Sequence, residues 1–145
     1  NTSDGAESSL NLVSGTGENV TVGRGAGRGA TGATYYQNAF GGMNSGYAAD
    51  TAHQNAAWGH SSLIGCTSCS GIFAGGYFAA QTLTTATNST ILGQQVGSTT
   101  FATGSNVILL GTSANVDTPL ASTSNFMNLG SVIFATGITG KSSSR

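Results

Sequence analysis

The stretch Asn38–Ser45 reads NAFGGMNS, and the stretch Asn55–Ser62, seventeen residues later, reads NAAWGHSS. Both place an asparagine four residues before a glycine and a serine three residues after it. The glycine recurs at steps of 19, 17, 17, 17, 18 and 19 residues, at Gly23, Gly42, Gly59, Gly76, Gly93, Gly111 and Gly130. A period this short does not fit a pair of helices but fits one coil of a β-solenoid. The sequence therefore predicts an all-β protein, a parallel β-solenoid or β-roll of about seven short coils.

The residues around each glycine indicate two short strands that meet at a corner. Glycine adopts the backbone angles that a sharp corner needs, and asparagine tolerates the left-handed region at another corner. Small or apolar residues stand three positions after the glycine, at Ala26, Ser45, Ser62, Ala79, Val96, Ala114 and Ile133. Each coil is thus expected to hold a strand, a glycine bend, a second strand and a variable loop.

Length and composition bound the protein class. The 145 residues predict one domain, and only 6% of them are charged, with a net charge of −1. No basic patch is present to recruit nucleic acid, and no apolar run approaches the ~20 residues of a membrane span. We expect residues 1–18 to form a lead-in segment with a strand at Ser9–Ser14, residues 19–136 to form the repeat array, and residues 137–145 to form a flexible tail.

The strand before each glycine is apolar on both faces, which predicts an oligomer. The positions three and one before the glycine alternate with a middle position that is apolar in five of the seven coils, at Phe40, Ala57, Ala74, Ile91 and Leu109. A continuous apolar run is typical of a strand buried on both faces. One face can fill the coil, and the other needs a partner. We expect that partner to be an identical subunit, in a homotrimer.

Two cysteines, Cys66 and Cys69, form a CxxC motif. A local disulfide, free thiols in a surface loop, or a metal site completed by a ring of His60 side chains across a three-fold axis are the alternatives. A structural zinc site needs four ligands, and no second CxxC or paired histidines stand at finger spacing. We therefore predict no metal and no cofactor.

The residue types of a hydrolytic triad, Asp50, His53 and Ser61 or Ser62, lie close in sequence but without the GxSxG turn of a nucleophile. Asp50 and Asp117 are about four coils apart, or ~19 Å at ~4.8 Å per coil. Glycosidase carboxylates lie ~5–9.5 Å apart. We therefore predict no catalytic residue and a non-enzymatic role.

Aromatic residues are the best candidates for ligand contact, because tyrosine and tryptophan are favoured binding anchors and aromatic faces stack on sugars. Neutral hydroxyl and amide groups around them suit neutral sugars. The predicted ligand-binding residues are Tyr35, Tyr36, Tyr47, Trp58 and Tyr77, with a seam position as the alternative for Trp58.

The pattern N-x-x-x-G-x-x-A resembles the head repeat of YadA-type trimeric adhesins. The last unit, Ser124–Gly137 (SNFMNLGSVIFATG), resembles a sequence motif of phage tail-fibre-like proteins. Such families form homotrimers of parallel β-rolls that project from a virion or cell and touch host surfaces. The resemblance implies a stalk or host-contact segment of a phage tail fibre, located in the virion tail, that binds host glycans weakly. The alternatives are the head of a bacterial trimeric autotransporter adhesin, on the cell surface, and a polysaccharide depolymerase.

Overall fold

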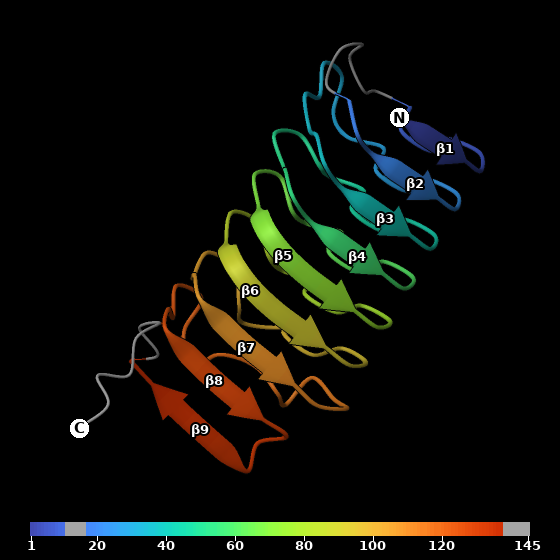
Figure 1. Ribbon diagram of the computed structural model, residues 1–145. Coiled ribbons are helices and arrows are strands. Elements are labelled where there is room, and N and C mark those ends of the chain that lie inside the picture. Colours follow the sequence, from blue (N-terminus) through green and yellow to red (C-terminus); the bar gives the residue numbers. More distant parts are fainter. Residues whose placement is uncertain (11–16, 138–145) are drawn as a thin grey trace.

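The computed structural model describes residues 1–10 and 17–137, and within them the protein is all-β with no helix. Nine strands form one sheet in the order of the chain (Figure 1). Their bounds are β1 (Thr2–Asp4), β2 (Val20–Val22), β3 (Ala39–Gly41), β4 (Ala56–Trp58), β5 (Ser70–Gly75), β6 (Thr87–Leu92), β7 (Val107–Leu110), β8 (Phe126–Leu129) and β9 (Ile133–Thr136).

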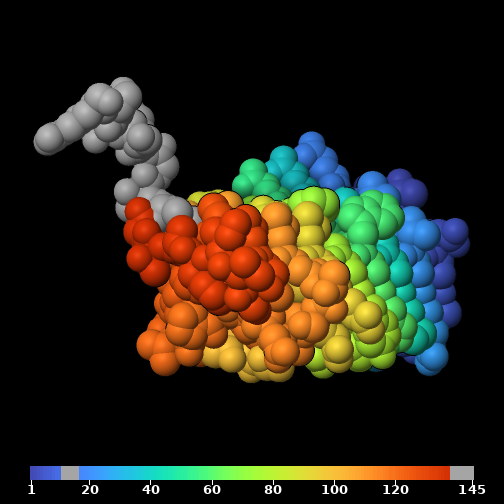
Figure 2. All heavy atoms as spheres, turned by 90° about the horizontal axis from the view of Figure 1, so that it is seen from below, coloured from blue at the N-terminus to red at the C-terminus, as the bar shows by residue number. Residues whose placement is uncertain are grey.

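Strands β1 to β8 pair in parallel, each with the next one along the chain. The chain returns to the start of each new strand through a loop, so that successive coils stack along one axis, from the blue N-terminal coil to the red C-terminal end in Figure 2. The prediction of a parallel β-solenoid of about seven coils is confirmed.

Corner glycines stack directly on one another and set the register of the coils. Gly42, Gly59, Gly76 and Gly93 have φ angles of 114°, 130°, 130° and 124°, which favour glycine. A Cβ atom added to Gly76 would lie 2.5 Å from the carbonyl oxygen of Gly93. Close stacking and backbone angle therefore both exclude a side chain at Gly76.

Gly5 belongs to the same column, with φ 114°, although the sequence analysis did not include it. Strand β1 pairs with β2, and Gly23 N donates to Asp4 O at 2.7 Å. The beginning of the chain is thus part of the array. The predicted strand at Ser9–Ser14 lies mostly outside the described residues, and the predicted tail lies outside them except for Gly137.

A second corner lies five residues before each glycine, where every residue has a positive φ of 49° to 68°: Glu18, Gln37, Gln54, Gly71, Asn88, Asn106 and Asn125. The prediction of asparagine at a left-handed corner is therefore right for Asn106 and Asn125. It is wrong for Asn19, Asn38 and Asn55, which follow this corner and point into the coil.

These inward asparagines form a buried ladder across the coils. Asn38 donates from its backbone N and from Nδ2 to Asn19 Oδ1, at 3.0 and 3.1 Å. Asn55 donates in the same way to Asn38 Oδ1, at 3.0 Å for both bonds. Ile72 N then donates to Asn55 Oδ1 at 2.9 Å and ends the ladder. The equivalent positions of the later coils hold Ser89, Val107 and Phe126, and there Val107 N donates to Ser89 Oγ at 3.0 Å.

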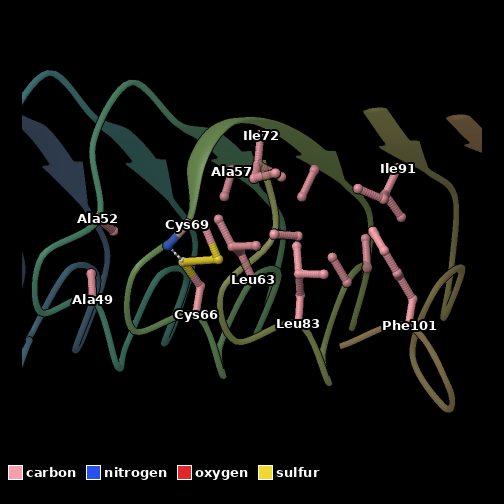
Figure 3. Close-up of a cluster of buried hydrophobic side chains, with 14 of the residues drawn as sticks. Ala49, Ala52, Ala57, Leu63, Cys66, Cys69, Ile72, Leu83, Ile91 and Phe101 are labelled. Carbon is pink, nitrogen blue, oxygen red and sulfur yellow. Dashed lines mark hydrogen bonds between the residues drawn. A yellow bond between two sulfur atoms is a disulfide. The ribbon is translucent and has the colours of Figure 1, made fainter. Parts of the chain in front are cut away.

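The core is one column of side chains inside the coils (Figure 3). In β2 to β8 the residue two before the corner glycine points inward and is buried: Thr21, Phe40, Ala57, Ala74, Ile91, Leu109 and Asn128. Loops add large side chains such as Leu63, Leu83 and Phe101, all fully buried. The positions three and one before the corner glycine therefore face outward.

The prediction of a second strand after the corner glycine is wrong for Gly23 to Gly111, because the residues that follow these glycines form turns. Three residues after the glycine, Ala26, Ser45, Ser62, Ala79 and Val96 are buried inside the coils, but two later positions differ. Ala114 is only half-buried, and Val116 takes its place inside, since Gly97 N donates to Val116 O at 3.0 Å as Ala80 N does to Val96 O at 2.9 Å. Ile133 is 55% exposed, because the chain turns back after β8 and β9 pairs with it antiparallel. The sixth coil thus carries two extra residues in its turn, and no seventh inward position follows β8.

We predict that Asn38→Ala lowers the free energy of unfolding by at least about 2 kcal/mol, because Asn55 N and Nδ2 would both lose a buried acceptor. Chemical denaturation followed by circular dichroism measures the change. Asn115→Ala is the control, since Asn115 is exposed and should change stability by less than about 0.5 kcal/mol. Equal effects of the two variants would contradict a stabilising ladder.

We also predict that Gly76→Ala prevents folding or destabilises by more than about 4 kcal/mol, because a Cβ there meets Gly93 O. Gly130→Ala is the matched control: its φ of 61° is also positive, but no atom lies within 4 Å of the added Cβ. That variant should lose about 1–2 kcal/mol. Thermal unfolding distinguishes the two, and a Gly76→Ala protein as stable as Gly130→Ala would show that the corner tolerates a side chain.

Candidate functional site

The outward side of β2 to β8 is an apolar strip, here called the outer face. It consists of the residues three and one before each corner: Val20, Val22, Ala39, Gly41, Ala56, Trp58, Phe73, Gly75, Thr90, Leu92, Ile108, Leu110, Met127 and Leu129. Trp58 and Phe73 are 49% and 45% exposed. No charged residue stands on it, and Thr90 is its single polar side chain. Apolar surface of this extent is typical of an interaction site.

Two glycines on the outer face make room for larger neighbours. A Cβ atom on Gly41 would lie 2.0 Å from Cε3 of Trp58, so the indole ring lies over Gly41. Leu92 likewise reaches over Gly75, with Cδ2 at 2.9 Å from the added Cβ. Neither glycine has a positive φ, so space rather than backbone angle accounts for glycine at these positions.

A shallow groove of about 740 Å³ runs along the outer face beside these side chains. Ala39 and Ala56 line its middle, and Val20 and Phe73 stand on the strands before and after them. Its rim is a row of polar side chains in which Gln37 Nε2 donates to Glu18 Oε2 at 2.8 Å and Gln54 Nε2 donates to Gln37 Oε1 at 3.3 Å. The groove thus combines an apolar middle with two amide groups and the Glu18 carboxylate along one edge.

Tyr35 is buried, which corrects its prediction as a ligand-binding residue. Its side chain is fully covered and its ring centroid lies 6.2 Å from that of Phe40. Its hydroxyl donates to the carbonyl of Gly27 and forms a second hydrogen bond, of 3.1 Å, with the hydroxyl of Ser9. Burial raises the pKa of Tyr35 above 10.0, and the hydrogen bond with Ser9 opposes the shift. The residue belongs to the core.

The other tyrosines are at the surface but do not converge. Tyr36 is 42% exposed and stacks on His53, with ring centroids 5.0 Å apart and planes 7° apart. Tyr77 is 46% exposed and packs edge to face with Phe78 at 4.3 Å. Tyr36 precedes β3 and Tyr77 follows β5, so they lie at opposite ends of the strands. The structure offers two separate aromatic patches.

Tyr47 and Trp58 lie apart from both patches. Tyr47 is half-buried beneath Arg28, whose guanidinium carbon is 5.3 Å from the ring centroid and whose Nη1 also lies 3.3 Å from Glu7 Oε2. Trp58 is on the outer face of β4 and is 49% exposed, so it does not belong to the core, and its neighbours there are apolar.

Cys66 and Cys69 are joined by a disulfide in the structure, with Cα atoms 5.7 Å apart. Both are fully buried (Figure 3). Cys66 N donates to the carbonyl three residues earlier, as do Ala49 N and Leu83 N in the neighbouring coils. The disulfide therefore fills the inward positions that alanine and leucine fill elsewhere, and it is part of the core.

The predicted absence of a catalytic group remains a prediction. Asp117 accepts from the backbone N of Thr99, Thr100, Phe101 and Thr118 at 2.7–3.0 Å and from Thr99 Oγ1 at 2.8 Å, so its carboxylate holds two loops together. Ser61 and Ser62 are buried, and Ser62 Oγ donates to Gly59 O. Among the described residues, no group of three or more His, Cys, Asp or Glu side chains is placed to hold a metal ion.

Sequence reasoning found the outer face as an apolar pattern but missed the groove in it. The signal was the pair of alanines, Ala39 and Ala56, at positions where other coils carry larger residues such as Phe73. The described part of the chain contains no helix that could cross a membrane. Comparison of the chain with family models, curated proteins and solved structures gave no match.

Proposed function

We propose that this chain is a non-enzymatic segment of a homotrimeric phage tail fibre, a stalk that also contacts the host surface. The observation that carries the proposal is the outer face, which is apolar and uncharged over seven successive strands. Three copies that turn this face toward a common axis would bury it, and each half-exposed Trp or Phe side chain would contribute up to about 1.5 kcal/mol. Closed rotational symmetry is the usual form of such assemblies.

The shape of the molecule supports a role as a fibre segment. The coils stack along one axis, with the first coil at one end and the last at the other (Figure 2). Each coil contacts its neighbours through parallel pairing, so the length grows with the number of coils. An elongated solenoid spans a long distance with few residues, which suits a stalk.

The disulfide supports a location outside the cytoplasm, since disulfides persist in oxidising surroundings. The virion tail is such a location. Asp117 supports the non-enzymatic part of the proposal, because its oxygens already accept five hydrogen bonds within the fold. Asp50 lies on another loop, far along the axis from Asp117.

The assembly is tested by light scattering coupled to gel filtration. We expect a particle of three chains of 14.3 kDa each. Leu110→Asp should dissociate it into folded monomers, because the side chain lies on the outer face and an unpaired carboxylate buried there costs several kcal/mol in each copy. Thr112→Asp, an exposed position two residues later, is the matched control and should remain assembled. A wild-type protein that is monomeric at micromolar concentration would refute the proposal.

Host contact is tested with the trimer on an array of neutral glycans. The double variant Tyr36→Ala, Tyr77→Ala removes the two exposed tyrosines and should lower binding at least tenfold, because aromatic faces that stack on sugars are lost while the outer face is unchanged. Gln94→Ala, exposed and non-aromatic, is the control. If the double variant binds glycans as well as the wild type does, the contact lies elsewhere on the surface. If the wild-type trimer binds no glycan, the segment is only a spacer.

A further inference from the structure

The outer face has two stripes whose side chains differ in size along the axis. The first stripe, three residues before each corner, is Val20, Ala39, Ala56, Phe73, Thr90, Ile108 and Met127. The second stripe, one residue before each corner, is Val22, Gly41, Trp58, Gly75, Leu92, Leu110 and Leu129. On β4 and β5 a large residue of one stripe stands level with a small residue of the other: Trp58 with Ala56, and Phe73 with Gly75.

Three-fold symmetry fixes which residues of the two stripes meet. A rotation about an axis parallel to the solenoid moves no residue along that axis, so each coil meets the same coil of the next copy. Cyclic contacts of this kind are heterologous, joining two different surfaces. The first stripe of one copy therefore faces the second stripe of its neighbour at the same height.

At the height of β3 and β4 the two stripes are complementary in size. The second stripe carries Trp58, whose ring lies over Gly41 and so occupies both levels. The first stripe has its groove at these same levels, lined by Ala39 and Ala56. One strand further on, Phe73 of the first stripe stands level with Gly75 of the second, over which Leu92 reaches, so the groove ends at this level.

The hydrogen-bonding groups and the lack of charge also favour a second copy of the chain as the partner that fills the groove. No other described residue accepts a hydrogen bond from Trp58 Nε1, and a buried indole N–H usually needs an acceptor. The groove rim supplies one in the side-chain oxygen of Gln54, whose Nε2 already donates to Gln37. The stripes carry no charge, so identical copies meet there without repulsion between like charges.

We propose that the Trp58 indole of each copy inserts into the groove of the next copy, on Ala39 and Ala56 and between Val20 and Phe73. This inference rests on the proposed trimer and names the contact that holds it together. Trp58 is then an interface anchor of the kind that dominates protein–protein binding.

Photo-crosslinking tests the contact. The full chain is made with benzoylphenylalanine in place of Trp58 and irradiated as the assembled trimer. We expect dimer and trimer bands on a denaturing gel and crosslinked peptides that contain residues 37–56 of a second chain. The same amino acid in place of Tyr36, which is exposed outside the outer face, is the control and should give no such bands.

The outcomes separate this inference from the proposed function. A protein that does not assemble even as wild type refutes the trimer itself. A trimer whose crosslinks map outside the groove refutes the insertion of Trp58 and leaves the trimer standing.

If the chain with benzoylphenylalanine at position 58 does not assemble, a second measurement tests the insertion of Trp58 into the groove. Ala56→Leu fills the groove and should weaken the trimer at least tenfold, whereas Thr90→Leu, on the same stripe but outside the groove, should not. Equal dissociation constants for the two variants, with unchanged circular dichroism, would overturn the proposal.

Discussion

The stacking of backbone on backbone at the glycine corners is the constraint on which the rest of the structure depends. Where Gly76 lies against Gly93, the next coil occupies the space that a side chain would need. Consecutive coils therefore lie as close as parallel pairing allows, and each residue stands above its equivalent in the coil before. Columns of equivalent residues follow from this close stacking. The asparagine ladder is one such column. The side chains of the core and the two outer stripes are further columns of the same kind.

Each coil encloses few side chains, so polar bonds and a covalent link supplement the apolar core. Asn38 and Asn55 connect neighbouring coils through bonds that are shielded from water, where an unmet polar group is costly. The Cys66–Cys69 disulfide fills the interior of its own coil. Asp117 joins two loops near the C-terminal end, beyond the last asparagine of the ladder. Different coils thus reach the same stacked geometry by different chemical means.

Much of this fold could be predicted from the sequence, because a corner glycine leaves a signal in spacing alone. Features that depend on the direction of a side chain or on the path of a loop could not be predicted in this way. The strands are apolar on both faces, so alternation predicted two buried sides without showing that Leu109 points inward and Leu110 outward. The pattern could not distinguish an asparagine at a left-handed corner from Asn38 in the ladder beside it. Val116 replaces Ala114 because two extra residues in one turn shift the column, and Ile133 leaves the column because the chain reverses. Tyrosine is a residue type that is common in binding sites, so the sequence predicted a surface position for Tyr35. The path of its loop, which the sequence does not show, buries the side chain.

The features that made the sequence ambiguous are also those that give the molecule a surface for assembly. A solenoid that worked alone would need polar residues on the outward positions of its strands, as one-sided sheets usually have. Here those positions hold Trp58, Phe73 and Leu110, and stacking lines them up over the whole length of the coils. Even Gly41 and Gly75, which the backbone does not require, serve to seat larger neighbours on this side. The interior explains how one chain folds, and the regular exterior that folding creates is the surface through which we propose that copies of the chain assemble.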